Sequence, residues 1–223
     1  MILLHGFLSS ALQNWFAPGI AASLAGSGHR VIAPDCRGHG QSAAPTDLAA
    51  WPADVMAADV EALIAQLELT DYDLVGYSMG GRTAARVMVR GARPRRCILG
   101  GMGDTGVMHA GPRAEAFEDA IRKGAAAANP AMGKAIHRMI QSQGLKPAAM
   151  LGVLAAFAPT THEELARVRT PTLAILGEDD HDNGSVDGLA GLMPNCTPLR
   201  LPGDHAGVVA TSAFRDALLK FLA

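Results

Sequence analysis

Residues 72–81 read YDLVGYSMGG, in which an apolar run meets a Gly-x-Ser-x-Gly pattern and then a helix-like run that continues to residue 90. This placement predicts a strand, a tight turn and a helix, with Ser78 at the apex of the turn. We expect glycine at positions 76 and 80 because a side chain there would collide with the neighbouring strand or helix. The strained turn would lift the Ser78 hydroxyl clear of the sheet, as a nucleophile requires.

Composition and charge limit the class of protein. The 223 residues, 49% hydrophobic and 18% charged, suit one globular domain with a modest insertion. A formal net charge of -2 gives no electrostatic reason to expect nucleic acid or an acidic membrane as a partner. Cys36, Cys97 and Cys196 cannot all pair within the chain and lack metal-ligand spacing, so we expect free thiols and a cytoplasmic protein.

Strand-like and helix-like runs alternate through the first hundred residues. This alternation is typical of an α/β fold, with a mostly parallel central sheet and flanking helices. Strands are predicted at residues 2–5, 30–33, 72–75, 96–100, 172–176 and 197–201, and helices at 15–25, 53–67, 79–90 and 211–222.

Residues 104–170 interrupt the alternation with helical patterns at 113–128 and 131–142, punctuated by proline and glycine, and with no convincing strand. A helical segment inserted between two sheet strands predicts a small cap. The predicted core therefore comprises residues 1–103 and 171–223, with the cap over 104–170.

A serine hydroxyl needs a neighbouring base, and the base needs a partner that fixes its tautomer. His205 follows the last predicted strand, and Asp180 follows the strand before it. Both occupy the carboxyl ends of parallel strands, where open α/β sheets place their sites. Ser78, Asp180 and His205 are thus the candidate catalytic residues, with Asp179 as the alternative acid.

An oxyanion that develops on a carbonyl also needs hydrogen-bond donors. The backbone N–H of Met79 is one candidate, because it follows Ser78 and begins a helix. The second is predicted in the loop after the first strand, at the backbone N–H of Phe7.

Five segments together resemble the α/β-hydrolase superfamily, in particular its compact members with a small helical cap. They are the oxyanion-type loop at 5–7, the turn at 34–42, the elbow at 76–80, the acid strand and loop at 171–180, and the histidine loop at 203–205. The resemblance implies a Ser-His-Asp hydrolase in which Ser78 attacks a carbonyl, His205 moves the proton and Asp180 orients His205. It implies no metal or organic cofactor, and structural roles for Arg37, His39 and His5.

The predicted activity is hydrolysis of a carboxylic ester by water, on a small to medium acyl substrate. The same residues serve carbon–carbon bond hydrolases, thioesterases, lactonases and acyltransferases, and a ligand sensor with slow turnover is an alternative of another class. Tyr77, Met132 and Met139 are predicted to line the substrate pocket, whereas the alternative for the two methionines is the core of the cap.

The chain departs from the family pattern at its beginning, since Met1 opens directly into the strand that the resemblance makes the third. Either the sheet is trimmed, with residues 30–33 as an exposed edge, or further residues precede this sequence. An exposed apolar edge favours pairing with another chain, so a homodimer stays open as an alternative.

Overall fold

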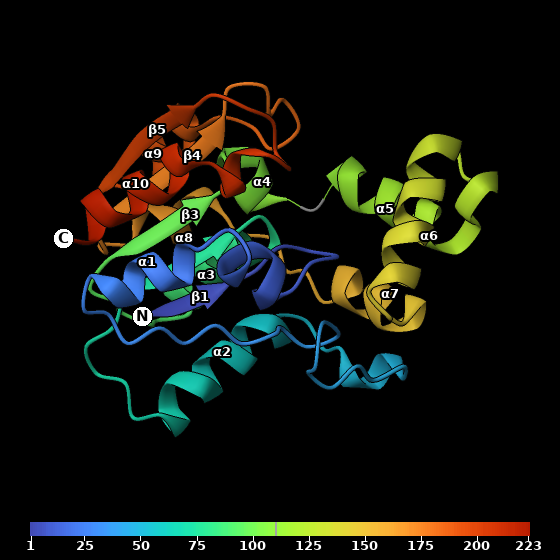
Figure 1. Cartoon of the computed structure of the whole chain (residues 1–223), viewed down its shortest axis with the longest axis horizontal. Helices are drawn as coiled ribbons and strands as arrows, with labels where there is room; N and C mark the ends of the chain where they lie inside the picture. The colour runs from blue at the N-terminus through green and yellow to red at the C-terminus, as the bar shows by residue number, and fades with distance from the viewer. Residues whose placement is uncertain (110) are drawn as a thin grey trace.

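The computed structural model describes residues 1–109 and 111–223, apart from the side chain of Pro112. It contains one parallel five-stranded sheet in which the strands lie in their sequence order (Figure 1). The strands are β1 (Ile2–Leu4), β2 (Leu74–Tyr77), β3 (Cys97–Gly100), β4 (Thr172–Gly177) and β5 (Cys196–Leu201). The predicted α/β class with a mostly parallel sheet is therefore confirmed.

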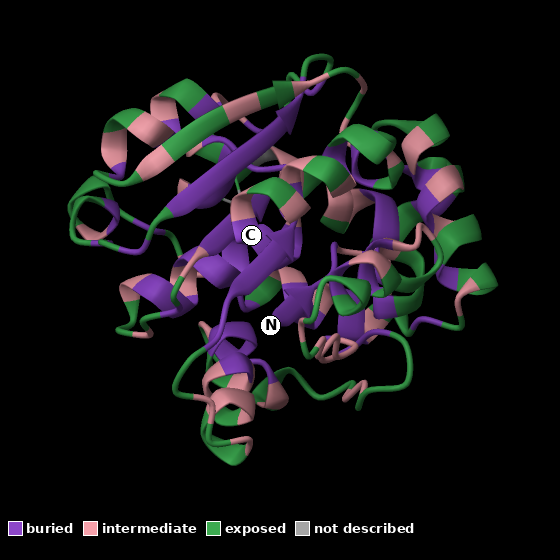
Figure 2. Cartoon of the chain, turned by 60° about the vertical axis from the view of Figure 1, so that its left-hand side comes forward, coloured by how far each residue is buried: buried purple, intermediate pink, exposed green. Residues whose placement is uncertain are grey.

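The burial of the strands follows from their place in the sheet. Every residue of β1 to β4 is buried, as expected where both faces of a parallel sheet are covered. β5 has only half-buried and exposed positions, and Figure 2 shows it beside the wholly buried β4. β5 also contains Pro198, which an edge strand tolerates because its outer side makes no ladder.

Helices cover both faces of the sheet because successive strand side chains point to opposite sides. In β1, Ile2 and Leu4 belong to the apolar cluster that also contains residues of α2 (Val55–Gln66), α3 (Met79–Val89) and α9 (Val186–Leu192). Leu3, between them, packs on the other face with α1 (Ile20–Gly26) and α10 (Ser212–Leu222).

The long segment between β3 and β4 is helical throughout its regular structure. It forms α4 (Asp104–Met108), α5 (Gly111–Lys123), η3 (Gly124–Ala126), α6 (Pro130–Ser142), α7 (Pro147–Ala155) and α8 (His162–Ala166). The other short turns are η1 (Leu12–Phe16), η2 (Leu48–Ala50) and η4 (Val208–Ala210).

The two ends of that segment differ from its middle. Val107 of α4 and Leu165 of α8 belong to the apolar cluster on the α3 face of the sheet. By contrast, α5, α6 and α7 lie together to one side of the sheet (Figure 1) and share a separate apolar cluster with Trp51 and Met79. We call α5 to α7, residues 111–155, the cap. The division of the chain into core and inserted domain stays a prediction.

The strand predicted at residues 30–33 is wrong, because the structure forms only an isolated parallel bridge between Ile2 and Ile32. The Ile32 N–H donates to the Met1 carbonyl, and the Leu3 N–H donates to the Ile32 carbonyl. The next donor in this ladder would be residue 34, but Pro34 has no N–H. The ladder therefore stops after one residue. A homodimer through this edge stays an open alternative.

Two predicted helices are shorter than expected. The helix predicted at 15–25 is divided into η1 and α1, with Gly19 in the left-handed region at φ 77° between them. The helix predicted at 113–128 ends at Lys123, because Gly124 has φ 55°. Glycine adopts this conformation without the penalty that a side chain would impose, so each position ends a helix.

Candidate active site

Ser78 occupies a sharp turn between the end of β2 and the start of α3. Its φ of 54° and ψ of -115° are unusual for a residue with a side chain. The Ser78 N–H donates to the carbonyl of Gly100, which ties the turn to β3 at 2.8 Å. A Cβ on Gly76 would overlap the Gly80 carbonyl, and one on Gly80 would overlap the Leu4 carbonyl. The turn therefore needs glycine at both positions.

His205 lies between Ser78 and Asp180. Its Nε2 is 2.9 Å from the Ser78 Oγ, and its Nδ1 is 2.6 Å from an Asp180 carboxylate oxygen. Asp180 comes from the loop after β4 and His205 from the loop after β5. The structure thus brings together the three predicted residues at one edge of the sheet, whereas the alternative acid Asp179 is exposed.

Asn183, which the sequence analysis did not identify, holds the Asp180 carboxylate. Its side-chain N–H₂ donates to both Asp180 oxygens, at 2.8 and 3.0 Å, and it is buried. Burial acts to raise the pKa of Asp180, but hydrogen bonds from His205 and Asn183 outweigh it and keep this pKa below its ordinary value. The carboxylate is therefore charged at neutral pH. A charged acceptor at Nδ1 favours a proton there, which leaves Nε2 free to accept the Ser78 proton.

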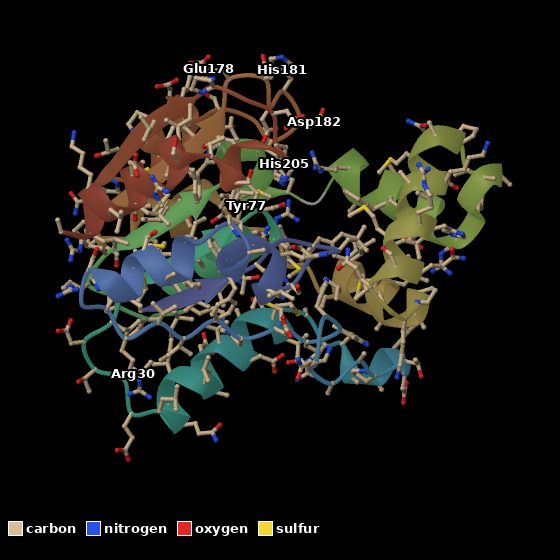
Figure 3. The ribbon with its side chains drawn as sticks, viewed as in Figure 1. Arg30, Tyr77, Glu178, His181, Asp182 and His205 are labelled. Carbon is tan, nitrogen blue, oxygen red and sulfur yellow. The ribbon has the colours of Figure 1, made fainter. Side chains whose placement is uncertain are left out.

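Tyr77, predicted to line the pocket, is instead buried beneath the His205 loop. Its hydroxyl donates to the backbone carbonyl of His205 at 2.5 Å, and its ring packs edge-on against Phe214. Figure 3 shows Tyr77 and His205 side by side near the edge of the sheet. The prediction was wrong because successive residues of an extended chain point to opposite faces, so Tyr77 points away from the Ser78 side.

The loop at residues 5–7 runs beside Ser78. A Cβ on Gly6 would lie 3.4 Å from the Ser78 Cβ, and the Gly6 N–H donates to the Asn14 side chain at 2.7 Å. Within the described part of the chain, the N–H groups of Phe7 and Met79 donate no hydrogen bond. Met79 begins α3, and N–H groups in the first turn of a helix have no partner within it. Both predicted donors are therefore free to bind an oxygen.

Two buried histidines fix this loop. His5 accepts from the Cys36 N–H at 2.9 Å, and His39 accepts from the Leu8 N–H at 3.3 Å. Burial lowers the pKa of both rings, that of His39 to about 3, so both are neutral. These contacts with backbone groups are what a structural role requires.

A small cavity of about 40 Å³ opens beside Ser78, between the edge of the sheet and the cap. Its apolar wall includes Phe7, Phe117 and Phe157, and two arginines, Arg82 and Arg113, also line it. Met132 and Met139 do not line this cavity, contrary to the prediction. Met132 packs against the cap's apolar cluster, and Met139 is 39% exposed.

A larger cavity of about 370 Å³ lies between α2 and residues 34–43. It shares no lining residue with the cavity at Ser78. The larger cavity does not contain Ser78, so the smaller cavity is the candidate active site. In the described ranges, no helix is long and apolar enough to span a membrane, and no three His, Cys, Asp or Glu residues are grouped to hold a metal ion.

Comparisons with known proteins agree with this fold. A family model described as the alpha/beta hydrolase fold matches residues 1–97. The chain is 37% identical over 90 residues to sn-1-specific diacylglycerol lipase ABHD11 of Xenopus laevis, a segment that spans 40% of this chain and 27% of that relative.

Solved structures match nearly the whole chain. A bromoperoxidase from Bacillus anthracis is 26% identical with a TM-score of 0.73, and an enol-lactonase from Burkholderia xenovorans LB400 is 26% identical with a TM-score of 0.72. Each match covers 99% of this chain and 90% of the other. From its sheet, its elbow and these likenesses, the chain has the α/β-hydrolase fold, and its first 97 residues are similar to the family of that name.

Proposed function

We propose that the protein is a serine hydrolase that cleaves carboxylic esters of small to medium acyl substrates. The observation that carries this proposal is the continuous hydrogen-bonded series from the Ser78 hydroxyl through His205 to the Asp180 carboxylate. Such a series raises the nucleophilicity of an alcohol that is otherwise inert at neutral pH.

In the first half of the reaction, the Ser78 Oγ bonds to the ester carbonyl carbon while His205 Nε2 takes the hydroxyl proton. The carbonyl oxygen becomes an oxyanion, which the N–H groups of Phe7 and Met79 stabilise. The intermediate then collapses, the bond from carbon to the alcohol oxygen breaks, and His205 gives its proton to the departing alcohol. An acyl-Ser78 ester remains.

In the second half, water replaces the alcohol. His205 Nε2 takes a proton from water as the water oxygen bonds to the acyl carbon, and the oxyanion forms again on the same two donors. Collapse breaks the bond to Ser78, whose oxygen recovers the proton from His205. Asp180 stays ionised and balances the positive charge on His205 in both halves.

The size of the cavity bears on the substrate. A volume of about 40 Å³ is far below the roughly 300 to 1,000 Å³ of pockets that bind small molecules. Side chains of the cap, Phe117 on α5 and Leu154 on α7 among them, therefore have to move before an acyl group can enter. This supports short acyl chains over long ones, and the size of the opened cavity sets the limit.

The test compares the wild type with Ser78→Ala on esters of increasing acyl length, on matched thioesters and on vinylogous diketones. We expect the short esters to react fastest and Ser78→Ala to lower kcat/KM by roughly 10⁴-fold or more. Unchanged ester turnover in Ser78→Ala contradicts the proposal. Preferred cleavage of thioesters or diketones would assign the same residues to a thioesterase or a carbon–carbon bond hydrolase.

A fluorophosphonate separates the enzyme from a ligand sensor. Stoichiometric labelling that depends on Ser78 supports an activated nucleophile, whereas a folded protein that stays unlabelled supports the sensor. Adding a short alcohol to the ester assay tests for an acyltransferase, because transfer would yield a new ester at the expense of the free acid.

A further inference from the structure

Arg82, on α3, is a buried cation. Its guanidinium is held by the backbone carbonyls of Gly106 and His109, at 2.6 to 2.8 Å, and only 8% of the residue is exposed. Among the described residues, no carboxylate forms an ion pair with it. One face of the guanidinium lies 4.7 Å from the centre of the Phe157 ring. Carbonyl dipoles and a ring compensate only part of the cost of burying a full charge.

Other arginines of this chain are compensated differently. Arg86, one turn further along α3, pairs with Asp54 and with Glu164. Arg95 and Arg96 both pair with the buried Asp73. Arg82 is thus an exception on its own helix, and it is the one that lines the cavity beside Ser78.

Arg113 adds a second positive charge to the same cavity. It comes from α5 and stacks on Phe117, with 5.6 Å between the guanidinium carbon and the ring centre. Its acidic contact is with Asp182 at 3.4 Å, and the Asp182 side chain is 81% exposed. An ion pair this open to water is weak, so a ligand can displace it at little cost.

The two charges oppose one another. Burial and the neighbouring Arg113 charge lower the pKa of Arg82 to about 10, so Arg82 is still charged at neutral pH but its charged form is destabilised. A bound anion would reverse that effect. Within the described part of the chain the Nη1 of Arg82 donates no hydrogen bond, so its two N–H groups are available to a ligand.

From this pair of arginines we infer that the substrate carries a free carboxylate in addition to its ester group. Arg82 and Arg113 bind this carboxylate while Ser78 attacks the ester carbonyl. The inference rests on the proposed function. Arg82 also anchors the backbone at residues 106 and 109, but within the described part of the chain those contacts use only its Nε and Nη2 and leave Nη1 without a partner. Arg82 and Arg113 are then specificity-determining residues.

The test uses two esters of the same shape. Monomethyl glutarate carries a carboxylate where methyl 5-methylhexanoate carries an isopropyl group. In both compounds the bond to be cleaved is a methyl ester, which releases methanol. Esters of butanoic acid with 4-hydroxybutanoate and with 4-methyl-1-pentanol place the same contrast on the alcohol side. We expect kcat/KM at least tenfold higher for the anionic member of one of these pairs.

Variants at Arg113 connect that preference to the structure. Arg113→Met is expected to lower the ratio of anionic to neutral kcat/KM about tenfold, and Arg113→Lys to restore part of it, since a lysine keeps the charge without the planar fork. Arg122→Met removes an exposed arginine from the same helix, one that pairs with Glu118, and serves as the control. Arg82→Lys repeats the test, with circular dichroism to check its folding.

The outcomes separate the inference from the proposed function. Equal kcat/KM within both pairs, with ratios unchanged in Arg113→Met, overturns the inference while labelling of Ser78 still supports the hydrolase. If no ester reacts, the inference is tested by calorimetric titration of monomethyl glutarate into Ser78→Ala and into the same variant with Arg113→Met added. Binding that Arg113→Met weakens about tenfold supports it, and no difference between the two proteins overturns it.

Discussion

The edge of the sheet and the cap enclose the same cavity, but different contacts hold them in place. At the edge, backbone fits against backbone, as where the Gly80 Cα lies against the Leu4 carbonyl. The cap is held by an apolar cluster of side chains such as Ile136 and Met150. Close-packed backbone admits almost no substitution, whereas an apolar cluster accepts many combinations of similar volume. The side chains of Ser78, His205 and Asp180 therefore have one geometry, and the wall opposite them can vary.

The largest expected effect tests the role of Asp180 at the edge of the sheet. Asp180→Asn keeps the shape of the side chain but removes the charge that favours the required tautomer of His205. If the proposed function holds, kcat is expected to fall by roughly 10⁴-fold, the size found for the same change in the triad of a serine protease. Steady-state kinetics on a short ester measures it.

Asp179→Asn is the matched control, because Asp179 is exposed and adjacent in sequence. The assignment of the acid fails if Asp179→Asn loses activity and Asp180→Asn retains it.

The next effect compares two glycines, one from each region. Gly80→Ala would place a methyl group on the Leu4 carbonyl, and we expect a loss of about 3 kcal/mol or more in the free energy of unfolding. Gly144, between α6 and α7, has φ 64°, and a methyl group there would meet no atom within 4 Å, so Gly144→Ala carries only the backbone cost of about 1 kcal/mol. Urea unfolding of both variants measures the difference. Equal losses would contradict the contrast between edge and cap.

The smallest effect concerns Asn183 and pH. The folded-state pKa of Asp180 is lowered, so its contribution to stability is present above the unfolded pKa of about 4 and is lost as pH falls through the folded value. Asn183→Ala removes two hydrogen bonds to the carboxylate and moves that pKa upward. We expect the free energy of unfolding to fall by about 1 to 3 kcal/mol at pH 7. This loss should become smaller at acidic pH, and kcat is expected to be about tenfold lower.

Unfolding curves at a series of pH values test this, with Asn195→Ala as the control, because Asn195 bonds a backbone carbonyl on the surface. A loss that is the same at every pH would show that Asn183 does not act through Asp180.

Features that depend on short-range geometry could be predicted from the sequence. The elbow around Ser78 follows from glycines on either side of one residue, and the approach of Asp180 and His205 follows from strands whose carboxyl ends share an edge. The α/β class follows from the alternation of strands and helices. None of these requires knowing which distant side chains meet.

Features that depend on tertiary contacts could not be predicted in this way. Asn183 follows Asp180 by three residues in a polar loop, and nothing in the pattern distinguishes it from its exposed neighbour Asp182. The prediction for Tyr77 was wrong because Tyr77 adjoins Ser78 in the sequence but its side chain lies on the opposite face of the sheet. The cap methionines were misplaced because helical periodicity shows an apolar face without showing what that face contacts.

The hydroxyl of Tyr77 joins the strand that ends at the elbow to the loop that carries the imidazole. Local opening of that loop would break this hydrogen bond and leave a phenol without a partner in an apolar layer. Fluctuations that would carry the imidazole away are thus opposed by a hydrogen bond to a residue of β2. The amides of residues 203–208 that are hydrogen-bonded are therefore expected to exchange with deuterium about as slowly as those of β2, as members of one cooperative unit.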